Sequence, residues 1–389
     1  MKPLNNPPSA LPAPDADALA HSGRTAALIR DEIAKCGGWI SFERYMELAL
    51  YAPGLGYYSA GARKLGAAGD FITAPEISPL FGHTLAQQVG GILGGGLGEV
   101  LEVGAGSGAL AAALLEELER MGALPLRYLI LELSADLRER SRDTLAARVP
   151  HLMERVTWLN RLPPDFEGVV LGNEVLDAMP VRLVHATAER IEEIGVELAQ
   201  GQFRFSPRPA AGELLQAATR LSLPANYRTE IGLAAQGFMH SLGACLKKGV
   251  ALFIDYGFAG AEYRHPQREE GTLMCHYRHR AHADPFFLPG LQDITAHVDF
   301  SAIAQAAVEG GMQVAGYATQ ASFLVNCGIT GLLSRVPPAD AQRYLPLSNQ
   351  ANRLLSPAEM GELFKVIALA RDWQGPLLGF ARGNRQHTL

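Results

Sequence analysis

The 389-residue chain lacks the features that mark several large classes of protein. It contains no run of 18 or more apolar residues, and its longest candidate, Val89 to Leu97, is interrupted by glycines, so no membrane span is predicted. Its 4 cysteines include no CxxC pair, which argues against a disulfide framework or a zinc ribbon and predicts reduced thiols, mostly in the core. The formal net charge is −6, so the clustered Lys and Arg that nucleic-acid binding requires are missing.

What is present indicates an ordinary globular protein. Hydrophobic residues make up 48% of the chain and charged residues 19%, at a length that suits one large domain or two smaller ones. Residues 1–23 are rich in Pro and Ala and have neither an apolar signal region nor an Arg-rich face. We therefore predict a disordered tail over 1–23 and a cytoplasmic location.

Apolar strands alternate with helical segments from residue 99 onward, which predicts an α/β fold. A Rossmann-like, mostly parallel sheet with helices on both faces is the expected architecture. The expected strands are 99–103, 128–131, 156–158, 169–171 and 250–254, and the expected helices include 109–120, 135–148 and 233–246.

The remaining segments are additions to this core. Residues 24–98 are predicted to form a helical and lid segment, with two helices over 24–50 and a helix starting near Ser78. Within the core, 99–385, we expect insertions at 182–230 and 258–310. The first should contain a β-hairpin around Gln200-Gly201, and 258–295 should be a loop, with strands resuming at 312–319 and 364–369.

A glycine-rich loop follows the first expected strand, where open parallel sheets bind nucleotide-like ligands. It comprises Gly104, Ala105, Gly106, Ser107 and Gly108, and it is preceded by Glu102. The spacing is GxGxG, whereas dinucleotide-binding proteins carry GxGxxG. An acid before the loop repels a pyrophosphate but attracts the ammonium and sulfonium groups of S-adenosylmethionine. We therefore predict this cofactor, with a nicotinamide dehydrogenase as the alternative at the level of the fold.

Further cofactor contacts are expected where the next strands end. Glu132 can accept hydrogen bonds from both ribose hydroxyls, and Leu133 and Ser134 follow it. Leu159 and Asn160 stand where the adenine is usually placed. Glu132 alone suits S-adenosylmethionine or NAD, and a tight turn without any ligand is the structural alternative for the loop.

Several ordered motifs resemble the MidA-like methyltransferases. They are 69–82 (GDFITAPEISPLFG), 172–181 (GNEVLDAMPV), 254–257 (IDYG), 271–273 (GTL), 293–300 (DITAHVDF) and 360–366 (MGELFKV). The similarity spans roughly 25–385. It implies a class I methyltransferase fold with added substrate-binding segments. Mitochondrial members are similar to protein arginine methyltransferases that act in respiratory complex I assembly. The resemblance thus implies an arginine side chain of a protein substrate, with a respiratory-complex subunit as one candidate and a homodimer left open.

Candidate catalytic acids follow the fourth strand. A guanidinium acceptor must be oriented by carboxylates, and Glu174, beside Asn173, is the first choice, with Asp177 as the second. Asn173 and Glu174 are also expected near the cofactor amine. The alternative for these acids is stabilisation of a helix N-terminus. Earlier in the chain, four residues are expected either to cap helices or to form a lid over the cofactor, namely Thr73, Pro75, Glu76 and Ser78.

His297 and Asp299 share a face if their segment is extended, so they are a further candidate for a general base or a structural pair. The tract from Cys275 to His282 has weak metal-ligand spacing, and a basic substrate-contact loop is preferred. Two other functions stay open. They are methylation of a small molecule and an assembly factor that binds the cofactor without turnover.

Overall fold

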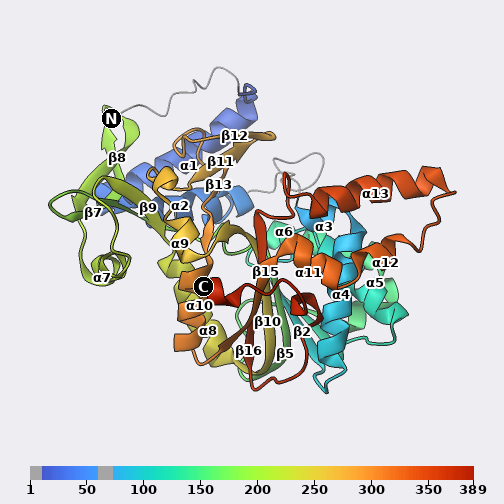
Figure 1. Cartoon of the computed structure of the whole chain (residues 1–389). Coiled ribbons are helices and arrows are strands. Elements are labelled where there is room, and N and C mark those ends of the chain that lie inside the picture. The colour runs from blue at the N-terminus through green and yellow to red at the C-terminus, as the bar shows by residue number, and fades with distance from the viewer. Residues whose placement is uncertain (1–10, 60–72) are drawn as a thin grey trace. The chain divides into compact units, whose positions relative to one another are not determined.

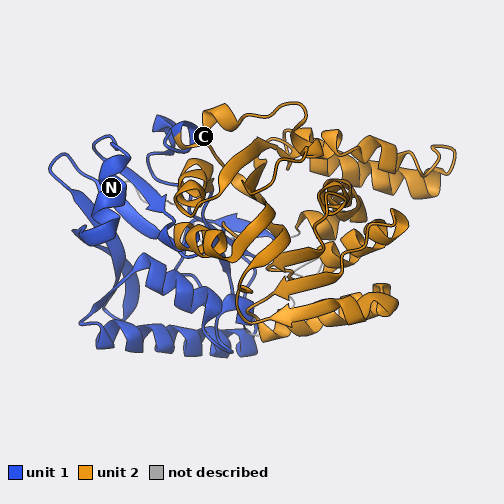
Figure 2. Cartoon of the chain, turned by 90° about the horizontal axis from the view of Figure 1, so that it is seen from below, with its two compact units in different colours: residues 1–71, 177–235, 261–297 blue, residues 72–176, 236–260, 298–389 orange. Residues whose placement is uncertain are grey.

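The structure is a computed structural model that describes residues 11–59 and 73–389. By their contacts these residues form two compact units, and each unit is assembled from stretches far apart in the sequence (Figure 2). Unit 1 takes its described residues from 1–71, 177–235 and 261–297, and unit 2 from 72–176, 236–260 and 298–389. The predicted segment 24–98 therefore contributes to both units.

Unit 2 is built on an eight-stranded sheet with the order β15-β16-β10-β5-β2-β3-β4, and β14 pairs with β10. Its strands are β2 (Glu99–Val103), β3 (Arg127–Leu131), β4 (Val156–Leu159), β5 (Phe166–Asn173), β10 (Leu246–Phe258), β14 (Val298–Asp299), β15 (Gln313–Thr319) and β16 (Phe364–Arg371). Strands β4, β3, β2, β5 and β10 run in parallel, whereas β16 is antiparallel to both of its neighbours. The predicted α/β fold with a mostly parallel sheet is confirmed.

Helices cover both faces of this sheet, with α4 and α5 on one side and α8 and α10 on the other (Figure 1). The helices are α3 (Ala74–Ile77), α4 (Pro79–Leu93), α5 (Ala109–Arg120), α6 (Ala135–Arg148), α8 (Leu233–Cys245), α10 (Phe300–Glu309), α11 (Gln320–Asn326), α12 (Ile329–Leu333) and α13 (Ala341–Leu355). Short 3-10 turns are η3 (Pro150–Arg155), η5 (Leu378–Phe380) and η6 (Gln386–Thr388).

The core of unit 2 explains why these segments form these elements. Val100 and Ile130, on neighbouring strands, are buried with Val89 of α4 and Leu114 of α5. Each such side chain contributes about 1.5–3 kcal/mol through removal of its apolar surface from water. Helix α5 is mostly Ala, Leu and Glu, which are strong helix formers. The buried face of α5 and the high helix propensity of its residues therefore both favour a helix at this position.

Unit 1 contains a five-stranded antiparallel sheet and a three-stranded sheet. The strands are β1 (Trp39–Ser41), β6 (Arg182–Ala186), β7 (Ile191–Ala199), β8 (Gln202–Pro209), β9 (Tyr227–Ile231), β11 (Met274–Tyr277), β12 (Arg280–His282) and β13 (Asp293–Thr295). The other elements are α1 (Ala16–Lys35), α2 (Phe42–Tyr51), η2 (Tyr57–Ser59), α7 (Gly212–Arg220), α9 (Gly260–Tyr263) and η4 (Pro266–Arg268).

The predicted hairpin around Gln200-Gly201 is confirmed. Strands β7 and β8 pair up to Ala199 and Gln202, and the two turn residues have φ angles of 51° and 77°. A two-residue turn needs this left-handed backbone at both positions because it matches the twist of the strands.

The two helices predicted over 24–50 are present, and the Ser41 hydroxyl, at the end of β1, caps α2. Two local predictions were wrong. Helix α1 begins at Ala16, where the Asp15 carboxylate accepts a hydrogen bond from the Ala18 N–H at 2.8 Å, so 16–23 is not a tail. The predicted loop 258–295 contains β11, β12 and β13, whose short length and many His and Arg residues give little strand signal.

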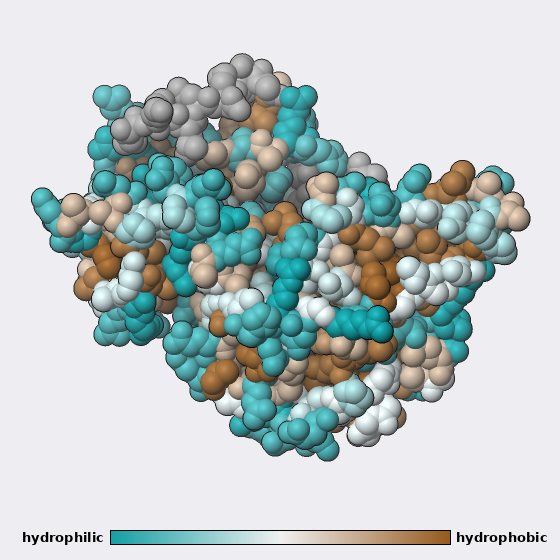
Figure 3. All heavy atoms as spheres, viewed as in Figure 1, coloured by the Kyte–Doolittle hydropathy of each residue, from teal (hydrophilic) through white to brown (hydrophobic). Residues whose placement is uncertain are grey.

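On the face seen in Figure 3, apolar residues are scattered among hydrophilic ones. Exposed apolar side chains include Leu126, Leu133 and Leu345, which belong to separate elements or loops. Scattered apolar residues are normal on protein surfaces. In the part of the chain that the structure describes, no helix has the length and apolar character needed to cross a membrane.

Candidate functional site

The glycine loop connects the end of β2 to the start of α5, as the sequence predicts. The φ angles of Gly104, Gly106 and Gly108 are 67°, 55° and 80°. A Cβ on Gly108 would lie 2.9 Å from Cα of Ser141, and one on Gly104 would lie 3.0 Å from a methyl group of Val175. A side chain at Gly104 or Gly108 would be strained and would crowd these atoms, and the left-handed backbone at Gly106 also favours glycine. The Gly104 N–H also donates to the Leu131 carbonyl at 2.8 Å, which fixes the loop against β3.

Glu132 lies directly after β3 and contacts this loop. One carboxylate oxygen accepts a hydrogen bond from the Gly106 N–H at 3.3 Å, and the other accepts from the Ser134 N–H at 2.9 Å. Burial raises the pKa of Glu132, and the two backbone donors offset part of the increase. Leu133 beside it is 78% exposed. The Ser134 hydroxyl accepts from the Leu137 N–H at 3.2 Å, so it caps α6.

Arg138, which the sequence analysis did not select, joins the ends of two strands. Its Nε donates to the Glu132 carbonyl at 2.8 Å, and its Nη2 donates to the Leu159 carbonyl. These bonds fix the backbone at two of the predicted cofactor positions, while Asn160 is exposed. An Arg four residues after a helix cap is too common for sequence inspection to identify this role.

Glu102 is buried, with 2% of its surface exposed. The Tyr128 hydroxyl on β3 donates to its Oε2 at 2.6 Å. Burial raises the pKa of Glu102 to about 7, against the lowering effect of the tyrosine hydrogen bond, and the nearby Glu132 adds to the increase. The sequence analysis selected Glu102 but not Tyr128, because an aromatic residue in a strand usually belongs to the core.

Asn173 is the last residue of β5, and Glu174 follows it at the carboxyl end of the strand. Glu174 has a φ of 53°, which is strained for a residue with a side chain. Its N–H donates to the Ile254 carbonyl at 2.8 Å. Its Oε1 accepts from the Ala74 N–H at 3.3 Å and from Asn173 Nδ2 at 3.1 Å. The backbone thus holds this carboxylate in a defined place at some energetic cost.

Asp255 of β10 organises the residues that follow Glu174, and the sequence analysis missed this role. One oxygen accepts hydrogen bonds from the N–H groups of Val175 at 3.1 Å and Leu176 at 2.9 Å. The side chain is buried, with 1% of its surface exposed. The only signal in the sequence was the IDYG motif, which contains this residue.

The predicted lid residues lie around α3 and α4. Glu76 accepts a hydrogen bond from the hydroxyl of Ser107, which ties α3 to the glycine loop. The Ser78 hydroxyl accepts from the Leu80 N–H at 3.2 Å and caps α4, so its helix-capping alternative is confirmed. Thr73 precedes α3 without a side-chain capping bond, and Pro75 lies in the first turn.

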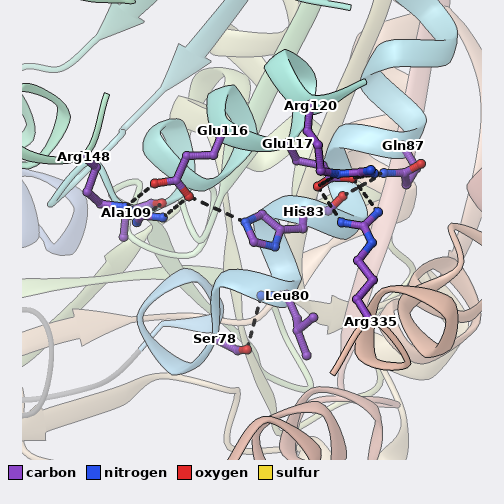
Figure 4. A network of polar contacts seen from close by, with 10 residues as sticks. All are labelled: Ser78, Leu80, His83, Gln87, Ala109, Glu116, Glu117, Arg120, Arg148 and Arg335. Carbon is purple, nitrogen blue, oxygen red and sulfur yellow. Dashed lines mark hydrogen bonds and ion pairs between the residues drawn. The ribbon is translucent and has the colours of Figure 1, made fainter. Parts of the chain in front are cut away.

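Away from the loop, a polar network connects α4, α5 and the end of α12 (Figure 4). Glu117, with its side chain 2% exposed, accepts hydrogen bonds from Arg120, from Gln87 and from both terminal nitrogens of Arg335. Burial alone would raise the pKa of Glu117, but the two arginines outweigh it and bring the pKa to about 2. Glu116 on the same helix pairs with Arg148 at 2.6 Å.

The remaining catalytic candidates are divided between the two units. In unit 1, the Asp177 carbonyl accepts from the Ala296 N–H at 3.1 Å, and the His297 N–H donates to Thr272 Oγ1 at 3.1 Å. In unit 2, the Asp299 carboxylate accepts from the Ser301 N–H at 3.1 Å and caps α10. Strand β14 begins only after His297, so the extended segment expected for a His–Asp pair is very short. Their pairing stays a prediction.

The tract from Cys275 to His282 forms the hairpin of β11 and β12. Cys275 is fully buried, and burial raises the pKa of its thiol well above the usual value. Across residues 11–59 and 73–389, no three His, Cys, Asp or Glu side chains are grouped as a metal ion would need.

Comparison with known proteins identifies the family. Residues 84–318 match the family model described as "Putative S-adenosyl-L-methionine-dependent methyltransferase". A crystal structure from Burkholderia thailandensis, bound to S-adenosyl-homocysteine, is 54% identical and superposes with a TM-score of 0.95, covering 98% of this chain and 100% of that one.

Curated relatives are more distant. The mouse protein named "Protein arginine methyltransferase NDUFAF7, mitochondrial" is 29% identical over 86% of this chain and 82% of its own length. The Drosophila melanogaster homologue is 27% identical over 94% of this chain and 89% of its own length. With its glycine loop, its parallel sheet and a family match over most of its length, the chain belongs to the S-adenosyl-L-methionine-dependent methyltransferases and uses S-adenosylmethionine as its cofactor.

Proposed function

We propose that the enzyme transfers the methyl group to an arginine side chain of a protein substrate. The observation that carries this proposal is Glu174, whose carboxylate is held on a strained backbone at the edge of the sheet where β5 ends. The left-handed backbone of Glu174 is not part of a hairpin turn, and its place after β5 at the end of the parallel strands supports a functional role. Curated relatives named as protein arginine methyltransferases support the same acceptor.

The residues around the glycine loop fit the cofactor. Gly104 and Gly108 have little space for a side chain, Glu132 presents carboxylate oxygens, and no cation among the described residues acts on Glu102. We propose that the cofactor is held by Thr73, Pro75, Glu76, Ser78, Glu102, Gly104, Ala105, Gly106, Gly108, Glu132, Leu133, Ser134, Leu159, Asn160, Asn173 and Glu174. When bound, S-adenosylmethionine supplies an electrophilic methyl group on a positively charged sulfur.

The protein's own task is then alignment of the acceptor. An arginine guanidinium is permanently charged and planar, so a fixed carboxylate can grip it through two parallel hydrogen bonds. Glu174 takes this role in the proposal, with Asp177 in support and with His297 and Asp299 as the candidates for removing a proton. Positioning of this kind lowers the barrier more than acid–base chemistry does in a methyl transfer.

The test is incubation with methyl-labelled S-adenosylmethionine and an extract of the source organism, followed by hydrolysis and amino-acid analysis of the labelled protein. Labelled methylarginine is the expected product. Label in the low-molecular-weight fraction would indicate a small-molecule acceptor instead. Tight cofactor binding without transfer to any fraction would indicate an assembly factor that does not turn over.

We also propose three further points: the acceptor is a subunit of a respiratory complex, the protein is located in the cytoplasm, and two chains form a homodimer. The first rests on the similarity to the MidA-like family. Mass spectrometry of the labelled band identifies the acceptor, cell fractionation gives the location, and light scattering measures the mass of the particle against 41.8 kDa for one chain.

A further inference from the structure

A buried pair on the cofactor side of unit 2 is not explained by packing alone. Tyr128 and Glu102 lie on neighbouring strands, on the face covered by α4 and α5, and are 0% and 2% exposed. The Tyr128 hydroxyl donates to the Glu102 carboxyl at 2.6 Å, a distance typical of a hydrogen bond between these two groups. Glu102 stands two residues before Gly104, so this pair lies next to the loop.

Within the described residues, no cation pairs with Glu102. The groups that act on it are Tyr128 and Glu132, both from the β3 side. On its other side β5 is apolar at the paired position, Leu171. The titratable groups of α4 and α5 facing the core, His83, Glu116 and Glu117, are engaged with one another or with Arg120, Arg148 and Arg335. Burial of a carboxylate without a cation costs free energy, so these surroundings favour the neutral acid.

A cofactor that carries positive charge changes this balance, because an opposite charge nearby favours the ionised carboxylate. We propose that Tyr128 is a positioning residue for the cofactor: its hydroxyl holds the Glu102 carboxyl next to the glycine loop, and cofactor binding drives the proton of that carboxyl into solvent. The inference rests on the proposed placement of the cofactor at the glycine loop.

The tyrosine is suited to this task. Burial raises the pKa of Tyr128 well above 10, so its hydroxyl stays protonated and donates to the carboxylate at every physiological pH. Its hydrogen bond also lowers the pKa of Glu102, which makes release of the proton easier. A phenylalanine would fill the same space but would do neither.

The experiment is isothermal titration of the purified full chain with S-adenosylmethionine, which carries the sulfonium charge and is not consumed without a methyl acceptor, in buffers of different ionisation enthalpy, between pH 5.5 and 8.5. Because Glu102 has a pKa of about 7 before binding, affinity should rise with pH up to about 7 and then level off. Below this pH, affinity should fall up to about tenfold per pH unit. About half a proton should be released per ligand at pH 7.

In Tyr128→Phe the rise should move to higher pH, with affinity about tenfold lower at pH 6.5 and close to wild type at pH 8.5. Tyr45→Phe is the matched control. Tyr45 is also fully buried and donates one hydrogen bond, to the Pro285 carbonyl at 2.7 Å, but it belongs to unit 1. A purely structural loss would lower affinity equally at every pH, and this outcome would overturn the proposal.

Two further variants keep the test decisive if Tyr128→Phe folds poorly. Glu102→Gln should abolish proton release, while Glu139→Gln, at an exposed acid of α6, should retain it. The opposite pattern, or a wild-type protein that releases no proton and binds equally from pH 5.5 to 8.5, overturns the inference. In either case, loss of binding in Gly106→Val would still support the placement of the cofactor at the glycine loop. A failure of the inference about Tyr128 can therefore be distinguished from a failure of the proposed cofactor placement.

Discussion

Glu117 and Glu102 are two glutamates of unit 2 with equal burial and opposite chemistry. Each is 2% exposed, yet the pKa of Glu117 is about 2 and that of Glu102 is about 7. Glu117 accepts hydrogen bonds from Arg120 and Arg335, whereas Glu102 accepts one from the neutral Tyr128. Among the described residues, burial raises the pKa of both acids, and the two arginines beside Glu117 reverse that effect there.

The comparison separates structural acids from acids that await a ligand. Where the chain supplies both charges, as at Glu117, the acid connects helices and contributes to folding. Where the described residues place no cation beside a buried acid, as at Glu102, we expect a ligand to supply the opposite charge. Glu102 precedes the glycine loop and Glu117 does not, which is in keeping with the cofactor role proposed for Glu102.

The largest effect is expected at the loop. Gly106→Val should reduce affinity for S-adenosylhomocysteine by about 100-fold or more, because a β-branched residue is strained at a φ of 55° and its methyl groups occupy the space of the ligand. Gly122→Val is the control, since Gly122 has a φ of 67° at the other end of α5 with nothing near its Cβ. Equal losses of affinity in both variants would show that strain alone is responsible.

Glu174→Gln should retain cofactor binding, weakened only by the contact proposed with the cofactor amine, and should lower turnover on an arginine acceptor by about 100-fold, because an amide cannot accept two charge-assisted hydrogen bonds from a guanidinium. Single-turnover rates with labelled cofactor measure this. Glu167→Gln, an exposed acid at the other end of β5, should behave as wild type. An unchanged rate for Glu174→Gln would move the role to His297 with Asp299.

Glu117→Gln tests the structural acid. Its low pKa means that the stabilisation is complete above pH 4.5 and disappears as the pH falls toward about 2. The variant should lose about 2 to 3 kcal/mol of unfolding free energy at pH 7, and the difference from wild type should shrink below pH 4.5. Urea unfolding at several pH values measures it. Glu116→Gln, whose partner Arg148 is also partly exposed, should cost less than about 1 kcal/mol.

The smallest effect is expected for Glu132→Ala. Loss of the ribose hydrogen bonds should weaken binding of S-adenosylhomocysteine by about 1 to 3 kcal/mol, or about 5- to 150-fold. Glu139→Ala removes an exposed acid of α6 and should leave affinity unchanged. If Glu132→Ala binds as tightly as wild type, Glu132 only supports the Gly106 and Ser134 backbone.

Much of unit 2 could be predicted from the chain. Strand β2, the glycine loop and α5 follow from an apolar run, three glycines and a helix of strong helix formers, all of which are local signals. Unit 1 was harder, because β11, β12 and β13 are only three or four residues long. Strands this short are stabilised by partners far along the chain, and no local pattern records those partners.

The sequence by itself determined the cofactor loop, the acid at the end of β3 and the family. These depend on residue type and spacing over short stretches. Only the tertiary structure decided that Tyr128 meets Glu102, that Arg335 meets Glu117 across 218 positions of the chain, and that Asp255 holds the backbone after Glu174. The state of a buried acid is set by the charges that folding brings beside it, and those neighbours are distant in sequence.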